Sequence, residues 1–240
     1  SSFTRNTLLF VGGRVINLAL APLAMILLPG LLGERGYGQF GYWFSLISLY
    51  LILLDLGTQP VIRRFVPELH KHPAQASTLV WFSLKLRILP LLLVAAALLF
   101  TSDPKTQWIL LGSALLASLS TTFADLYYSR EQMGRHVYIS SARKVLRLLL
   151  VPLFFILWDI PGILAALLVA ELIAFLLGLP ALRLLPKPRA PLPQPYWYYH
   201  CVGLSVFLAY LIYTFIGRAP VLAASWSGMA LEEIGRIALV

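Results

Sequence analysis

The residues that could do chemistry in this chain are the few charges that interrupt its long apolar segments. Arg14, Arg87 and Arg147 lie toward one end of such segments, whereas Glu171 and Arg218 lie near or beyond the middle of theirs. Ionisable residues at membrane depth usually face a bundle interior or an aqueous cavity. Arginine also binds phosphate through bidentate, charge-assisted hydrogen bonds. We therefore expect these five side chains to line a cavity that receives an anionic group.

Alternatives stay open for these charges. The basic side chains could instead snorkel to the headgroups or form a collar that meets anionic lipid. Glu171 could take a coupling ion, a proton or sodium, or it could form a buried ion pair within the bundle. Because the first two apolar segments are antiparallel neighbours, we also expect Arg14 and Asp55 to lie close together.

Other kinds of site lack the residues that they need. The four histidines have no metal-ligand spacing, and the sequence has neither a GxSxG nucleophile motif nor a Walker loop. Cys201 is the single cysteine and cannot form an internal disulfide. The 19 basic residues are scattered among apolar segments, which does not indicate a nucleic-acid partner. We thus expect no enzyme, no metal site and no cofactor.

The elements that position these charges are apolar segments long enough to cross a membrane. The 240 residues are 59% hydrophobic and only 12% charged, whereas soluble domains have about 25% charged residues. About 20 apolar helical residues cross a bilayer core. The sequence therefore predicts an all-α polytopic membrane protein and excludes a cytosolic enzyme, a disordered chain and a secreted scaffold. The expected spans are about 7–33, 36–56, 78–101, 106–128, 139–158 and 160–183, with a seventh after residue 200.

The loops between these spans predict the orientation. Lysine and arginine are enriched on the cytoplasmic side, and the loops after spans two, four and six have more of them than the opposite loops. We expect a cytoplasmic N-terminus in the cytoplasmic (inner) membrane. The basic residues concerned are Arg63, Arg64 and Lys71, then Arg130, Arg135, Arg143 and Lys144, then Arg183, Lys187 and Arg189, against Arg35 and Lys105 on the other side.

The organisation suggests one lobe and the beginning of another. Residues 1–184 are expected to form a six-helix lobe, 185–200 a Pro-rich cytoplasmic linker, and 201–240 the start of a second lobe with span seven. The sequence around Gly38 is weakly similar to the sequence around Gly235. This similarity favours two structural repeats related by an axis along the membrane normal. The chain then reads as a fragment that lacks its C-terminal lobe, or as a half-length protein that pairs.

Two motifs are similar to a known family. GYGQFGYWFSL at 36–46 and DLGTQPVIRRFVPEL at 55–69, with a further stretch at 138–150, resemble the polysaccharide (O-antigen, Wzx-type) flippases of the multidrug/oligosaccharidyl-lipid/polysaccharide exporter superfamily. The resemblance implies a fold of 12 to 14 helices in two lobes around a central cavity. Within the motifs, Gly38, Asp55 and Gly57 are expected to be structural or gating residues.

The resemblance also implies a function. Family members flip a polyprenyl-pyrophosphate-linked oligosaccharide across the membrane by alternating access, for surface polysaccharides such as O-antigen and lipopolysaccharide. The expected partners are this lipid-linked oligosaccharide, membrane lipids, a coupling ion and the missing lobe. A multidrug exporter of the same superfamily is one alternative, although cationic drugs would favour acidic cavity residues. A non-transporting scaffold or a polymerase of the pathway is another, although a polymerase should have a long polar outer loop.

Overall fold

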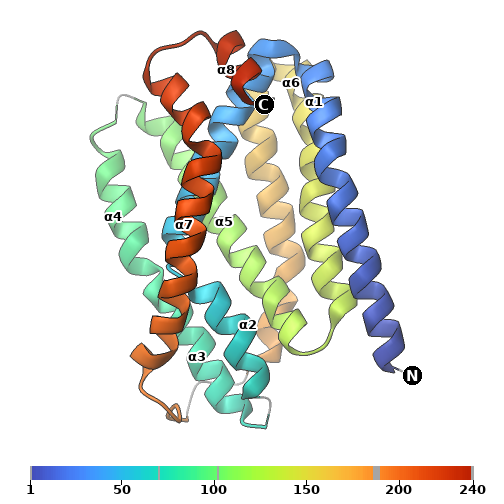
Figure 1. Cartoon of the computed structure of the whole chain (residues 1–240), viewed down its shortest axis with the longest axis vertical. Coiled ribbons are helices and arrows are strands. Elements are labelled where there is room, and N and C mark those ends of the chain that lie inside the picture. Colours follow the sequence, from blue (N-terminus) through green and yellow to red (C-terminus); the bar gives the residue numbers. More distant parts are fainter. Residues whose placement is uncertain (1, 70, 102, 186–189, 239–240) are drawn as a thin grey trace.

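The computed structural model describes residues 2–69, 71–101, 103–185 and 190–238, and within these ranges every regular element is a helix (Figure 1). This confirms the prediction of an all-α polytopic membrane protein. Five segments are long and apolar enough to cross a membrane. The helices are α1 (Ser2–Asp55), α2 (Thr58–Glu68), α3 (Pro73–Leu86), α4 (Ile88–Leu98), α5 (Pro104–Ser129), α6 (Met133–Gly178), a 3₁₀ helix (Leu179–Leu184), α7 (Tyr196–Trp226) and α8 (Leu231–Ala238).

The helices α1 and α6 are each a hairpin of two membrane-spanning legs. A straight helix of the 54 residues of α1 would be about 80 Å long, which is far more than a bilayer core needs. The chain reverses at Gly33 (φ 68°, ψ 173°) in α1 and at Asp159 (φ 53°, ψ −141°) in α6, and Figure 1 shows both reversals at the end opposite the N-terminus. The five segments therefore contain seven legs, as the sequence predicts.

The third predicted span differs from expectation because it is broken in the middle. The sequence predicts one helix at 78–101, but α3 ends at Leu86 and α4 begins at Ile88. Pro90 has no N–H to donate, and its ring would clash with the carbonyl group four residues earlier, that of Leu86. The break therefore falls at Arg87, the residue between the two helices.

The short helix α2 lies where the sequence analysis placed only a basic loop. Val61, Ile62 and Phe65 form its buried face, while Arg64 and Glu68 are exposed on the other side at 61% and 59%. The turn before α2 is tight, because Leu56 and Gly57 both have positive φ. This amphipathic helix closes the N-terminal end of the bundle (Figure 1).

The linker is shorter than the predicted 185–200. Residues 186–189 lie outside the described ranges, and α7 already begins at Tyr196, so the aromatic cluster forms the first turn of a helix. The ring of Tyr196 lies 3.5 Å from that of Phe82, and the ring of Tyr199 meets Phe65 edge-on at 4.9 Å. These residues dock α7 onto α2 and α3, although Trp197 remains exposed.

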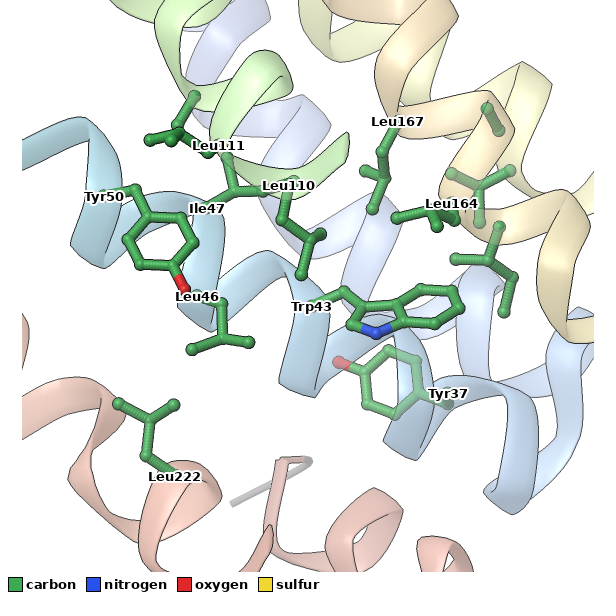
Figure 2. Close-up of a cluster of buried hydrophobic side chains, with 14 of the residues drawn as sticks. Tyr37, Trp43, Leu46, Ile47, Tyr50, Leu110, Leu111, Leu164, Leu167 and Leu222 are labelled. Atoms are coloured by element: carbon green, nitrogen blue, oxygen red, sulfur yellow. The ribbon is translucent and has the colours of Figure 1, made fainter. Parts of the chain in front are cut away.

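Buried apolar side chains hold the second leg of α1 at the centre of the bundle. Figure 2 shows this cluster, in which residues of α1 face leucines from α5, from the second leg of α6 and from α7. The second leg of α1 thus packs against α5, α6 and α7, and this packing fixes the helices that contain Arg147, Glu171 and Arg218. The labelled residues are Tyr37, Trp43, Leu46, Ile47, Tyr50, Leu110, Leu111, Leu164, Leu167 and Leu222.

Candidate functional site

Two adjoining cavities open between the helices that contain the predicted charges. The first, of about 680 Å³, lies between the first leg of α1, α2, α5 and the first leg of α6. The second, of about 710 Å³, lies between the second leg of α1, α2, α6 and α7. Pro60, Arg63, Thr121 and Arg143 line both cavities. The two cavities therefore share part of their lining, and together they make up the candidate site.

The lining of this site is strongly basic. Seven lysine and arginine side chains line the two cavities, against two carboxylates. A cleft lined by one sign of charge within low-dielectric walls concentrates ions of the opposite sign. The site can thus attract an anionic group into the membrane-spanning part of the protein. The basic residues are Arg14, Arg63, Arg64, Arg143, Lys144, Arg147 and Arg218, and the carboxylates are Asp55 and Asp125.

Glu171 is held inside the lobe by two arginines. Its side chain is fully buried, Arg147 donates to one carboxylate oxygen, and Nη1 of Arg143 lies 3.9 Å from the other. Arg143 also donates to the hydroxyl of Thr121 at 2.9 Å. The structure thus shows the buried-ion-pair alternative for Glu171. Because one carboxylate faces two guanidinium groups, a positive charge remains at the cavity wall.

Arg147 and Arg218 both contact the aromatic ring of Phe44. The guanidinium carbon of each arginine lies 5.0 Å from the centroid of the Phe44 ring, within the range of a cation–π interaction. Arg147 comes from α6 and Arg218 from α7, whereas Phe44 belongs to the second leg of α1. The aromatic ring therefore lets two like charges from different elements share one wall of the second cavity. All three residues line that cavity.

Arg87 is placed differently from the prediction. Its side chain is 3% exposed and lines neither cavity. Nη2 of Arg87 donates to Asp55 at 3.1 Å and to Thr58 at 2.7 Å, and Nη1 donates to the carbonyl of Ser118 at 3.1 Å. The guanidinium thus ties the end of α1, the start of α2 and α5 together. Arg87 is a structural cross-link here and not a lining residue.

Asp55 therefore has another partner than the sequence suggested. We expected it next to Arg14, but its ion pair is with Arg87, and its carboxylate also accepts hydrogen bonds from Thr58 Oγ1 at 2.8 Å and from the backbone N–H of Gln59 at 3.2 Å. The closeness of Arg14 and Asp55 stays a prediction, and nothing in the hydropathy pattern indicates the pair with Arg87. These contacts hold Asp55 at the junction of α1 and α2, and its structural or gating role stays a prediction.

Arg14 lies in the lining of the first cavity, as predicted. The first leg of α1 is held there against α6 by close packing of Gly13 on Val137. Asn17 donates to Ser141 at 3.0 Å, and Lys144 donates to the carbonyl of Asn17 at 3.2 Å. Arg14 and Arg218 thus lie in different cavities of the same site.

The two predicted glycines lie at close backbone contacts. A Cβ on Gly57, which has φ +76°, would overlap the carbonyl oxygen of Gly203 in α7, and a Cβ on Gly203 would overlap that of Gly57. A Cβ on Gly38 would overlap the carbonyl oxygen of Leu231 in α8. Only glycine permits these approaches, so each glycine fixes the place where the lobe meets α7 or α8.

The weak repeat noted in the sequence also makes a contact in space. A Cβ on Gly235 would overlap the carbonyl oxygen of Glu34 and would lie 3.3 Å from the N of Gly38. Arg236 donates to Glu34 at 3.0 Å, and these hydrogen bonds raise the pKa of Arg236 above its ordinary value. The pair is exposed and adds little stability. The two similar segments therefore pack on each other at the Gly33 end of the bundle.

Three lining residues have roles that sequence reasoning missed. Arg63 was treated only as a loop charge, because α2 was not expected to be a helix. Asp125 has no partner that its sequence position indicates, and its carboxylate lies 2.9 Å from Nε of Arg63. Phe44 is one aromatic residue among many in an apolar segment, and no sequence signal distinguishes it. Within the described ranges, no group of three His, Cys, Asp or Glu residues could hold a metal ion.

Comparisons with known proteins give one match. A family model with the description "polysaccharide biosynthesis protein" matches residues 3–191. The match includes α1 to α6, and therefore both hairpins and most of the basic lining, but it ends before α7. No curated protein and no solved structure matches the chain.

Proposed function

Because the chain belongs to the family of polysaccharide biosynthesis proteins, we propose that it flips a polyprenyl-pyrophosphate-linked oligosaccharide across the cytoplasmic membrane. The family and the apolar helices already make it a multi-pass membrane protein with a role in polysaccharide synthesis or export. The proposal adds the chemical step. The pyrophosphate and the sugars enter the cavities, the lipid tail stays in the bilayer, and the helices on either side move to open the site outward by alternating access.

The observation that carries the proposal is the basic lining inside membrane-spanning helices. Charged side chains at this depth are costly unless they have a partner or a function. Glu171 compensates one charge of Arg143 and Arg147, and Phe44 holds Arg218, so positive charge remains to meet a ligand. A pyrophosphate has several acceptor oxygens, and arginine can bind them two at a time. Tyr210 and Tyr213 line the same cavity and add hydroxyl groups.

The same observation argues against the multidrug alternative. A cationic drug needs carboxylates that are free to meet it, whereas Asp55 is already bound by Arg87, Thr58 and the N–H of Gln59, and Asp125 is paired with Arg63. Glu171 is likewise enclosed by arginines. A protein with this lining would repel organic cations and attract organic anions.

A transport assay on the full-length protein tests the proposal. The protein is reconstituted in liposomes with a polyprenyl-pyrophosphate oligosaccharide, and the appearance of sugar on the opposite leaflet is followed with a membrane-impermeant glycosidase. We expect transport of this lipid, and we expect Arg218→Ala to slow it more than tenfold at unchanged protein level. The matched control is Arg35→Ala, because Arg35 is exposed and lines neither cavity.

Two results would overturn the proposal. One is an absence of sugar translocation by the wild-type protein under conditions where it remains folded. The other is transport of an organic cation in place of the lipid. Equal transport by the wild-type protein and Arg218→Ala would remove Arg218 from the site.

A further inference from the structure

Asp125 is the least compensated carboxylate at the candidate site. It projects from α5 into the wall of the first cavity, and its side chain is 0% exposed. One carboxylate oxygen lies 2.9 Å from Nε of Arg63 in an ion pair. Beyond this ion pair, neither oxygen accepts a hydrogen bond from the described part of the chain. A buried carboxylate costs free energy unless it is paired and hydrogen-bonded.

Two further carboxylates, Asp55 in the lining and the buried Glu171, are better satisfied. Asp55 receives hydrogen bonds from a guanidinium, a hydroxyl and a backbone N–H. Glu171 lies between Arg147 and Arg143. Neutralising either of them would leave buried donors without an acceptor, which is expensive. Neutralising Asp125 would release only Arg63, whose side chain is 50% exposed and can turn to water.

The charged groups around Asp125 come from every element packed on it. α2 contributes Arg63, and α6 contributes Arg143 and His136, whose Nδ1 lies 3.0 Å from the carbonyl of Ala124. Asp55 at the end of α1 and Arg87 at the α3–α4 break act on Asp125 through space. Arg14, Arg64 and Lys144 line the same cavity. Arg63 and Arg143 both line the second cavity as well, and of these two it is Arg63 that forms the ion pair with Asp125.

We propose that Asp125 is a proton-binding site whose protonation frees Arg63 to bind an anionic ligand in the adjoining cavity. The inference rests on the proposed function, because it names the place where proton uptake is linked to that ligand. One proton from water adds to a carboxylate oxygen of Asp125, and the ion pair with Arg63 breaks. The released guanidinium then faces the ligand. When the ligand leaves, Arg63 returns and the proton is released.

The linkage has a definite sign. Binding of the anion favours the free Arg63 and therefore the protonated Asp125, so anion binding takes up a proton. Affinity for the anion must then rise as the pH falls, by at most about tenfold per pH unit for one linked proton. The coupling site becomes Asp125, whereas the sequence analysis suggested Glu171.

Proton binding can be measured without any ligand. Infrared difference spectra of the purified full-length protein between about pH 8 and pH 5 report new carboxylic-acid groups, because ordinary exposed carboxylates titrate below this range. We expect a carboxylic-acid band in the wild-type protein that is lost in Asp125→Asn. Glu68→Gln is the matched control, because it removes the acidic partner of Arg64 on the same helix and leaves Asp125 unchanged. A band that persists in Asp125→Asn overturns the proposal.

Anion binding is measured with radiolabelled sulfate, whose own charge is constant over this range. The wild-type protein and Glu68→Gln should bind sulfate more tightly as the pH is lowered, by up to about tenfold per pH unit, until Asp125 is protonated in the ligand-free protein as well. Asp125→Asn should bind it tightly at every pH, since it imitates the neutral acid, and Arg63→Gln should bind it weakly at every pH. A slope that survives in Asp125→Asn or in Arg63→Gln overturns the proposal, as does a slope that only His136→Gln removes. If Asp125→Asn does not fold, Arg63→Gln alone decides.

These results separate the inference from the proposed function. If the wild-type protein flips the lipid-linked oligosaccharide but Asp125→Asn keeps the pH slope for sulfate, the inference is wrong and the function stands. If Asp125→Asn removes the slope but no lipid is flipped, the proton-linked anion site stands and the proposed function is wrong.

Discussion

At the scale of single residues, the pairing around Glu171 decides how much of the basic lining is available to a ligand. Arg147 contacts one carboxylate oxygen of Glu171, while Arg143 is 3.9 Å from the other and also donates to Thr121. Breaking a buried ion pair by removing one partner is costly because the remaining charge stays buried without compensation. The cluster has one acidic residue, Glu171, and two basic residues, Arg143 and Arg147, so removal of the acid and removal of one base are not equivalent.

Glu171→Gln should therefore destabilise the protein more than Arg147→Gln. Loss of the acid leaves two guanidinium groups together and should lower the free energy of unfolding by about 3 kcal/mol or more. Loss of Arg147 leaves Glu171 with Arg143 and should have a smaller effect. Thermal unfolding of both variants in detergent, followed by tryptophan fluorescence, shows which of the two is less stable. Equal losses for the two variants would mean that Arg143 does not compensate Glu171.

Phe44 supplies a second prediction at this scale. Phe44→Leu keeps an apolar side chain but removes the aromatic face that Arg147 and Arg218 share, an interaction of about 0.5–2 kcal/mol per arginine. We expect transport of the lipid-linked oligosaccharide to fall by about threefold to thirtyfold, and Phe44→Tyr to retain it. If Phe44→Leu transports at the wild-type rate, the ring does not position the arginines.

The sequence predicts which charges lie at membrane depth, but not their partners. Glu171, Arg147 and Arg218 could be identified because each interrupts an apolar segment, and the structure places Arg147 and Arg218 in the cavity lining. The partner of Asp55 could not be predicted, because Arg87 lies 32 residues further along the chain and reaches Asp55 and α5 only through the packing of the helices. Interactions between residues far apart in sequence have no spacing rule.

At the scale of elements, hydropathy predicts the spans well and their local breaks poorly. Seven apolar segments correspond to seven helical legs because a bilayer requires about 20 apolar residues for each. The reversals at Gly33 and Asp159 occur near the predicted ends of spans one and five. Helix α2 was missed because its apolar face has only four buried residues, Val61, Ile62, Phe65 and Val66, too few to form an apolar segment of membrane-spanning length.

The reversal in α6 predicts a stabilising substitution. Asp159 has φ 53° and ψ −141°, a conformation that is strained for any residue with a Cβ and free for glycine. Asp159→Gly should therefore raise the free energy of unfolding by about 1 kcal/mol, measured as a higher midpoint of thermal unfolding in detergent. Asp159→Asn removes the charge and keeps the Cβ, so it should change little. If Asp159→Asn raises the unfolding midpoint as much as Asp159→Gly does, the effect comes from removal of the charge and not from relief of backbone strain.

At the scale of the whole molecule, the loops predict an orientation that can be tested directly. Lys71 lies in the loop after α2 and Lys105 in the first turn of α5, and both are exposed. Figure 1 shows the two regions at opposite ends of the bundle. The excess of basic residues near Lys71 predicts that this end is cytoplasmic.

Labelling of single cysteines measures this orientation. In a Cys201→Ser background, a membrane-impermeant maleimide should label Lys105→Cys in intact cells and Lys71→Cys only after the membrane is permeabilised. The denatured proteins, labelled in full, control for expression. The reverse pattern would place the N-terminus outside and would direct the basic cavities to the other side of the membrane.

The two glycine contacts have a mechanical consequence. The backbone approach of Gly57 and Gly203 lies toward the N-terminal end of the bundle, and that of Gly38 and Gly235 lies at the opposite end. The second cavity lies between α7 and the second leg of α1. A larger side chain at either contact would push α7 or α8 outward and would thereby change the width of this cavity.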